Sequence, residues 1–213
     1  MHRLDGIIFD LDGTLVDSAP LYAEALALSL ERNRAKIAPE EIPHLLLSMQ
    51  LTTDLISLGI SETRAHLIAD HRDREVIRLF STRTKWMPGA ERFSGKIAST
   101  MPSGIVTNAW KTTVDAIHLC THIRDRFRII IDGNTMNGKF KPDPHGLLLA
   151  AEAMGTPPKT TLYIGNREMD FAAAKAAGMR SCLFGISSHD TKIDEDRPEI
   201  CVQSWDSLEE IIF

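Results

Sequence analysis

Two aspartates, Asp10 and Asp12, stand two residues apart directly after a short apolar run, and Gly13 follows them. Taken singly, an aspartate at such a place is typical of a helix cap or a turn. As a pair they can divide catalytic work, because one carboxylate can act as a nucleophile while the other carries a proton. Aspartate plays this nucleophilic role in enzymes that form an aspartyl phosphate. The pair therefore predicts phosphoryl-transfer chemistry, provided that other groups hold the phosphate.

Further polar residues follow later apolar runs. Thr107 and Asn108 end one run, Lys141 lies in a Lys-Pro-Asp-Pro segment after the next, and Asn166 ends a third, with Asp170 four residues on. A carboxylate beside a phosphate costs about 4 kcal/mol per pair of unit charges at about 4 Å in an effective dielectric of about 20. Cations must therefore accompany the aspartates, and a lysine together with a set of oxygen ligands suited to Mg²⁺ meets that need.

Five short apolar runs are predicted to be the buried strands that position these residues, at 6–10, 104–108, 128–132, 161–166 and 181–186. Their apolar residues are continuous rather than alternating, which indicates that both faces of the sheet are covered. Helical patterns occupy the stretches between the last four runs, so we expect an α/β protein with a doubly wound parallel sheet. Ligands of such sheets bind beyond the carboxyl ends of the strands, where the polar residues stand.

The chain between the first and second runs contains no strand-like segment and is predicted to be an all-helical insert. Ser18 with Pro20 marks the start of one helix, Pro43 lies near the start of a second that continues to Ile56, and Ser61 opens a third. The charged residues at 66–75 are interpreted as a face exposed to solvent. We expect an α/β core at residues 1–16 and 87–213 and a helical cap domain at residues 17–86.

Four segments, in this order, resemble the four motifs of the haloacid dehalogenase superfamily, and the resemblance covers nearly the whole chain. DLDGTLVDS at 10–18 is similar to the first motif, Thr107 in IVTN to the second, Lys141 in GKFKPDP to the third, and GNREMD at 165–170 to the fourth. The helical insert after the first motif points to the phosphatase branch with a helical cap, which includes phosphoglycolate phosphatase and beta-phosphoglucomutase. The second aspartate favours phosphate over halide, because the dehalogenases of the superfamily lack it.

The resemblance implies a role for each residue of the first three motifs. Asp10 would be the nucleophile and Asp12 the general acid and base. Thr107 and Lys141 would hold the phosphoryl group. Asn108 would open a helix whose N-terminus also favours an anion.

The resemblance also implies Mg²⁺ as cofactor, with Asp10, Asp12, Asn166 and Asp170 as its ligands. Asn166 departs from the family pattern, which ordinarily has an aspartate there as a direct ligand. An amide oxygen can coordinate Mg²⁺, but the site loses a negative charge, so we expect weaker binding than in a typical relative.

The expected function is hydrolysis of a small phosphorylated metabolite by a Mg²⁺-dependent phosphatase that forms an aspartyl phosphate. Two alternatives stay open: a phosphomutase of the beta-phosphoglucomutase kind, and a weakly active or inactive binding protein of the superfamily, which the asparagine at 166 suggests. Among residues of the insert, His44, Gln50 and Arg83 are candidates for reaching the substrate.

Composition excludes other classes of function. With 43% hydrophobic residues, 25% charged residues and a net charge of −5, the chain is typical of a globular protein, and neither nucleic acid nor a membrane is expected as a partner. Three widely spaced cysteines without a CxxC pair, no signal-peptide core and no run of about 18 apolar residues indicate a cytoplasmic protein. A monomer or homodimer is expected.

Overall fold

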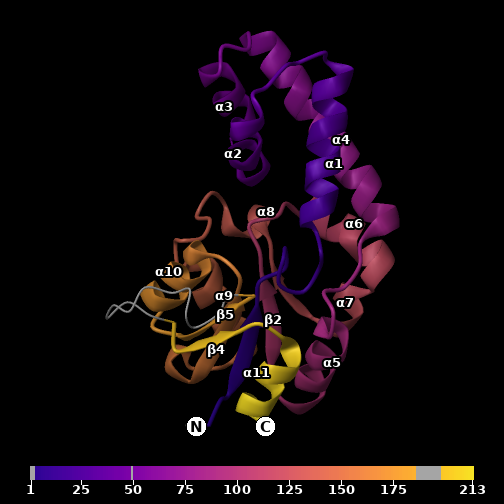
Figure 1. Ribbon diagram of the computed structural model, residues 1–213. Helices are drawn as coiled ribbons and strands as arrows, with labels where there is room; N and C mark the ends of the chain where they lie inside the picture. Colours follow the sequence, from indigo (N-terminus) through magenta and orange to yellow (C-terminus); the bar gives the residue numbers. More distant parts are fainter. Residues whose placement is uncertain (1–2, 49, 186–197) are drawn as a thin grey trace.

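The computed structural model describes residues 3–48, 50–185 and 198–213, and a parallel sheet with the strand order β3-β2-β1-β4-β5-β6 forms its centre (Figure 1). The strands are β1 (Gly6–Phe9), β2 (Ser103–Val106), β3 (Ile129–Ile131), β4 (Thr161–Gly165), β5 (Arg180–Phe184) and β6 (Ile200–Val202). The predicted doubly wound α/β fold is confirmed, and each expected run contains a strand. Strand β6 is not among the predicted runs, and its three residues directly follow the polar segment 187–199.

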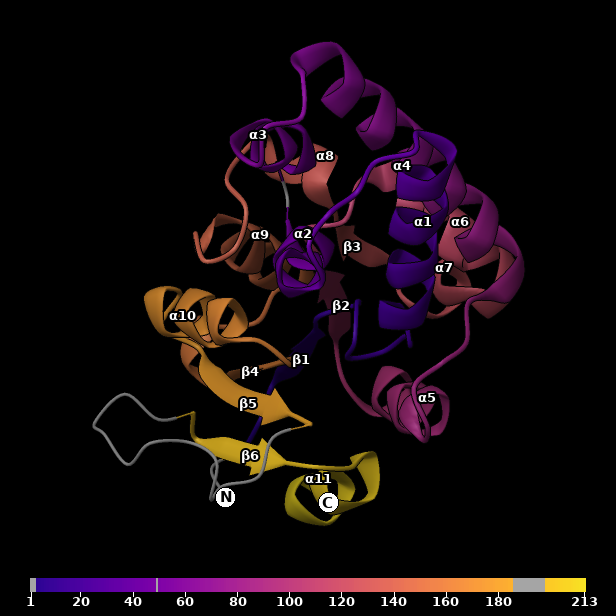
Figure 2. The ribbon, with the colours of Figure 1, turned by 45° about the horizontal axis from the view of Figure 1, so that its top comes forward.

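Helices cover both faces of the sheet, and each face has its own hydrophobic core. Ile7 and Phe9 of β1 pack into the core beneath α5 (Ala90–Thr100) and α11 (Trp205–Ile212), whereas Ile8 packs into the core beneath α9 (His145–Met154) and α10 (Glu168–Ala176). Figure 2 shows α5 and α11 on one side of the strands and α9 and α10 on the other. The helices that follow the helical insert in the chain are α5 (Ala90–Thr100), α6 (Lys111–Thr121), α7 (Ile123–Arg126), α8 (Gly133–Met136), α9 (His145–Met154), α10 (Glu168–Ala176) and α11 (Trp205–Ile212), with a 3₁₀ turn at Pro158–Thr160.

Every described element between β1 and α5 is helical, as the sequence predicts. The helices are α1 (Ala19–Arg32), α2 (Ile42–Leu47), α3 (Leu51–Ser57) and α4 (Glu62–Arg83), with a 3₁₀ turn at Pro39–Glu41. The prediction of one helix from Pro43 to Ile56 is wrong, because α2 ends at Leu47 and α3 begins only at Leu51. The Ser48 hydroxyl accepts a hydrogen bond from the main-chain N–H of Gln50 at 2.9 Å, a local contact that competes with helix formation.

Helix α4 connects the inserted helices to the rest of the molecule. Near its start, Ala65 and Ile68 belong to a small core that the inserted helices form among themselves. Near its end, Leu79 and Phe80 belong to the core beneath α5 and α11. With 22 residues at about 1.5 Å each, α4 is about 33 Å long and reaches both cores.

The two chain segments that enter and leave the insert run side by side. The main-chain N–H of Asp17 donates to the carbonyl of Lys85 at 3.0 Å, and that of Met87 donates to the carbonyl of Leu15 at 2.8 Å. The boundaries of the cap domain at residues 17 and 86 stay a prediction, although these two hydrogen bonds link the chain segments on either side of those boundaries. Most of the segment 187–199, expected to be a surface loop, lies outside the described residues. Within the described part of the chain, no helix is long and apolar enough to cross a membrane.

Candidate active site

A cavity of about 700 Å³ lies at the carboxyl ends of β1, β2 and β4, between the sheet and the inserted helices. The strand order reverses at β1, and ligands of doubly wound sheets bind at this point. The residues that the sequence nominates for catalysis and for phosphate and metal binding all line this cavity: Asp10, Asp12, Thr107, Asn108, Lys141, Asn166 and Asp170. The structure therefore brings the nominated residues together, while their individual roles stay predictions.

The ammonium group of Lys141 is the centre of the polar network, and this side chain is buried. Its Nζ lies 2.5 Å from Oδ1 of Asp10, 2.6 Å from Oδ1 of Asp170 and 2.8 Å from the hydroxyl oxygen of Tyr163. An ammonium group has three donors, so these acceptors satisfy it. Burial alone would lower the pKa of Lys141, but the two carboxylates outweigh burial and raise that pKa above its usual value. The lysine is therefore positively charged.

Asn108 holds the main chain of Lys141. Its Oδ1 accepts a hydrogen bond from the Lys141 N–H at 2.9 Å, and its Nδ2 donates to the Lys141 carbonyl at 3.2 Å. The expectation that Asn108 opens a helix is wrong, because α6 begins only at Lys111. The hydroxyl of Thr107 accepts from the N–H of Ala109 at 3.0 Å, which turns the chain before the helix starts. Asn108 thus contacts the lysine that the site depends on.

Asp170 is fixed by the first turn of α10. Its Oδ2 accepts hydrogen bonds from the main-chain N–H groups of Asn166 and Arg167, at 3.1 and 3.0 Å, while Oδ1 accepts from Lys141. Glycine is needed at 165, because a Cβ there would lie 2.4 Å from the Asp170 side chain. Both carboxylate oxygens are engaged, so Asp170 holds Lys141 in this structure.

Asp10 and Asp12 differ in their surroundings. Burial raises the pKa of Asp10 to about 7, although the ammonium of Lys141 opposes the rise, and its Oδ2 accepts from the Thr14 hydroxyl at 3.2 Å. Burial also raises the pKa of Asp12, against the hydroxyl of Ser18. Oδ1 of Asp12 has no hydrogen-bond partner among the described residues. Asp10 is therefore held in place, whereas Asp12 has an oxygen free to exchange a proton with a ligand.

The loop after β4 offers an oxygen for a cation. Oδ1 of Asn166 is buried and has no hydrogen-bond partner in the part of the chain that the structure describes. The amide nitrogen of the same side chain packs against Gly13, where a Cβ would lie 2.4 Å away and where φ is +75°, a conformation that favours glycine. An unpaired buried oxygen is costly, and an amide oxygen near the carboxylates of Asp10 and Asp12 suits a hard cation such as Mg²⁺.

Tyr163 belongs to this network although its sequence context gives no sign of it. It lies inside the apolar run of β4, and its hydroxyl donates to Oδ1 of Asp170 at 3.1 Å while accepting from Lys141. Alternation along the strand is the only signal, because it turns Tyr163 to the face opposite Leu162 and Ile164.

The inserted helices contribute charged residues to the cavity lining that sequence reasoning does not assign to the site. Arg72 and Asp73 of α4 line the cavity. The interpretation of residues 66–75 as a face exposed to solvent holds for His66, Asp70, Asp73 and Arg74 but not for Arg72, whose side chain is only 18% exposed. Gln50 also lines the cavity, as the sequence suggests. The other two candidates do not: His44 lies 3.4 Å from Asp54 and Arg83 lies 2.7 Å from Glu24, in ion pairs among the inserted helices.

Fold and cavity together define a class of protein, a doubly wound α/β protein whose cavity at the strand ends holds a pair of aspartates and a buried lysine. Comparison with known proteins then gives the family. Residues 7–184 match the family model described as haloacid dehalogenase-like hydrolase. The chain is 31% identical to phosphoglycolate phosphatase of Escherichia coli (strain K12), with 95% of this chain and 90% of the relative aligned. The chain belongs to the haloacid dehalogenase-like hydrolases, which confirms the prediction of an enzyme in the phosphatase branch of this superfamily.

Solved structures show the same fold. A predicted phosphoglycolate phosphatase from Haemophilus somnus 129pt superposes with a TM-score of 0.85 at 20% identity, over 99% of both chains. CbbY from Rhodobacter sphaeroides, in complex with phosphate, superposes with a TM-score of 0.76 at 19% identity, over 97% of this chain and 96% of that one. At these identities the likeness concerns the fold alone.

The contacts of Asp170 predict that it stabilises the protein even when no metal is bound. In Asp170→Asn, a neutral amide replaces the carboxylate beside buried Lys141, and either orientation of the amide loses an acceptor. We expect the free energy of unfolding to fall by about 3–5 kcal/mol, the usual cost of breaking a buried ion pair. Urea denaturation in excess EDTA measures this change.

Asp70→Asn is the matched control, because Asp70 is exposed on α4 and the same exchange there should leave stability within about 0.5 kcal/mol. A loss in Asp170→Asn that appeared only when Mg²⁺ was added would show that Asp170 acts through a metal and not through Lys141.

Proposed function

We propose that this protein is a Mg²⁺-dependent phosphatase that hydrolyses a small phosphorylated metabolite through an aspartyl phosphate. It would act in the cytoplasm as a monomer or homodimer, with residues 17–86 as a cap over a core of residues 1–16 and 87–213. The observation that carries the proposal is the buried network at the sheet's switch point, where Lys141 holds Asp10 at 2.5 Å and Asp12 keeps an unpaired oxygen.

The two aspartates divide the reaction between them. A carboxylate oxygen of Asp10 attacks phosphorus, the bond to the leaving oxygen breaks, and Asp12 gives its proton to that oxygen. Asp12 then takes a proton from water, which attacks phosphorus and releases phosphate with Asp10 restored. The raised pKa of Asp12, caused by burial, favours its protonated form and suits the first of these steps. Lys141 and the hydroxyl of Thr107 hold the phosphoryl oxygens.

Asp10, the main-chain carbonyl of Asp12, Asn166 and Asp170 are the residues that would hold Mg²⁺. When bound, the ion supplies positive charge that favours ionised Asp10 and offsets the charge of the phosphoryl oxygens. Asp170 can join this set only by exchanging one of its present hydrogen bonds, whereas Oδ1 of Asn166 has none to give up.

The cavity favours a substrate with a second anionic group. Arg72 of α4 lines the cavity from the side of the inserted helices, and Lys141 lies at the base of the cavity in the core. Arg72 forms an ion pair with Asp73 through Nε at 2.7 Å, but a guanidinium has five donors, so several remain for a ligand. A carboxylate fits such a group in a bidentate manner. The phosphoglycolate phosphatases to which the chain is similar act on a phosphorylated carboxylate, which supports 2-phosphoglycolate as a first substrate to test.

The nucleophile assignment predicts the effect of Asp10→Asn. An amide cannot form the acyl phosphate, so release of phosphate from para-nitrophenyl phosphate should fall at least about 10³-fold. Phosphate release is measured at several Mg²⁺ concentrations, with circular dichroism to establish folding. Turnover close to that of the wild type would contradict the role of Asp10.

The products of the same assay distinguish the alternatives. With a sugar phosphate as substrate, free phosphate indicates hydrolysis, whereas transfer to a second hydroxyl indicates a phosphomutase. A folded wild-type chain without turnover at any Mg²⁺ concentration would support an inactive binding protein.

The asparagine at position 166 predicts that the protein binds Mg²⁺ weakly and that one added negative charge strengthens this binding. Asn166→Asp restores a negative charge beside the cation, so the Mg²⁺ concentration for half-maximal activity should fall by about tenfold. Asn137→Asp adds the same charge at an exposed turn and should leave the requirement unchanged. If both variants behave like the wild type, Asn166 does not contact the metal.

The position of Arg72 in the cavity predicts that replacing this residue changes the substrate preference. Arg72→Gln should lower kcat/KM for 2-phosphoglycolate by about 10–100-fold, chiefly through KM, because a charge-assisted pair with the carboxylate is lost. Para-nitrophenyl phosphate lacks that carboxylate and should be hydrolysed almost as well as before. Arg74→Gln, an exposed change on the same helix, is the control. Equal losses for both substrates would contradict recognition of the carboxylate by Arg72.

A further inference from the structure

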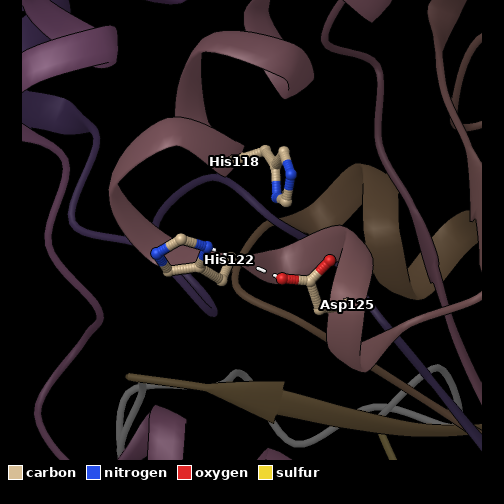
Figure 3. Close-up of side chains that lie close together, drawn as sticks. All are labelled: His118, His122 and Asp125. Carbon is tan, nitrogen blue, oxygen red and sulfur yellow. Dashed lines mark ion pairs between the residues drawn. The ribbon is translucent and has the colours of Figure 1, made fainter.

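Three side chains at the far end of α6 form a cluster that phosphoryl chemistry does not use. His118 lies in the last turn of α6, His122 is the residue between α6 and α7, and Asp125 follows in α7 (Figure 3). One donor atom from each of the three lies within 4.8 Å of the others. Among the residues that the structure describes, this is the only group of three histidine, cysteine, aspartate or glutamate side chains so close together.

The backbone holds this arrangement while leaving the side-chain ends adjustable. His122 joins α6 to α7 in the left-handed conformation, with φ +52° and ψ +32°, and this turn brings Asp125 beside α6. Ile117 and Ile123 are fully buried and anchor the two helices on either side of the turn. The side chains of His122 and Asp125 are 75% and 73% exposed, so both can rotate toward a ligand.

The donor atoms are not committed to strong bonds of their own. Nδ1 of His118 is buried and has no hydrogen-bond partner within the described chain. Nδ1 of His122 lies 3.6 Å from Oδ2 of Asp125, which is too long for a hydrogen bond. The rings of His118 and His122 meet edge to face with their centroids 5.9 Å apart. A bound cation would therefore displace no hydrogen bond that the cluster now makes.

The donor set selects the kind of cation. Two imidazole nitrogens and one carboxylate oxygen suit Zn²⁺ and neighbouring divalent transition metals, whereas Mg²⁺ prefers oxygen ligands alone. Metal bonds of about 2.0–2.1 Å put tetrahedral ligands about 3.4 Å apart, so the donor atoms, all within 4.8 Å of one another, must approach by at most about 1.4 Å. Rotation of the two exposed side chains can supply this movement. We propose that His118, His122 and Asp125 bind a divalent transition-metal ion, with Zn²⁺ as the reference ion, at a site separate from the phosphoryl cavity.

The position of the cluster predicts an effect on stability and not on chemistry. Thr113 lines the cavity near the start of α6, whereas His118 and His122 follow it by five and nine residues, about 8 and 14 Å along the helix direction. An ion that joins α6 to α7 binds the folded chain and raises its Tm with increasing metal concentration.

The test is calorimetric titration of the full-length protein with ZnCl₂ in saturating Mg²⁺, so that oxygen-ligand sites are occupied. One equivalent should bind to the wild type. His118→Asn and His122→Asn should each weaken binding at least about tenfold, and the double variant should abolish it. Asparagine tolerates the left-handed conformation of residue 122, which keeps the backbone of the turn. In the Co²⁺ form, visible absorption bands typical of low coordination number should be present in the wild type and absent from the double variant.

Three controls make the outcome specific. His66→Asn changes an exposed histidine on α4, Cys120→Ser removes the nearest thiol in the sequence, and Asp10→Asn alters the phosphoryl cavity. All three should bind Zn²⁺ like the wild type and show the same rise in Tm. Binding that survives in the double histidine variant, disappears in Cys120→Ser or Asp10→Asn, or is absent from the wild type at millimolar Zn²⁺ would overturn the proposal.

Discussion

The buried ammonium of Lys141 is the group on which the arrangement of the site depends. A buried charge is tolerated only when it is paired and its donors are satisfied, and here the partners come from β1, β4 and α10. The ends of β1 and β4 and the start of α10 must therefore meet at one point for the protein to fold. Two carboxylates surround one ammonium, so this group of charges is negative overall, and a phosphate dianion can enter only if further positive charge accompanies it.

The same network separates the two aspartates chemically. Burial raises the pKa of both, but only Asp10 lies within hydrogen-bond distance of the ammonium group, and it also accepts from Thr14. Asp12 stands two residues farther along, past the strand end, with one oxygen unpaired. Different surroundings for two like groups are the usual way in which a site assigns a nucleophile and a proton carrier.

Sequence reasoning succeeds here where the signal is local. The strand runs, the polar residues at strand ends and the helical insert are each visible within about ten residues, and a parallel sheet then brings the strand ends together. Sequence reasoning fails where the role of a residue depends on contacts with residues far away in the sequence. The hydroxyl of Tyr163 acquires its role from Lys141, 22 residues away, and Asn108 from the same lysine across 33 residues. Arg72 carries the signature of a solvated face until α4 is placed over the cavity.

Helix α4 restricts how the insert can move over the cavity. Because its first turns pack in the core of the insert and its last turns pack in the main core, bending within α4 would break apolar contacts at one end. The hydrogen bond from the main-chain N–H of Asp17 to the carbonyl of Lys85 joins the two segments that enter and leave the insert, and so forms a second connection between the insert and the rest of the molecule. The inserted helices therefore cannot swing over the cavity as a rigid body without breaking the contacts of Leu79 and Phe80 in the core beneath α5 and α11. Arg72 lies on α4 between its contacts with these two cores, so both cores together fix its position in the cavity that Lys141 also lines.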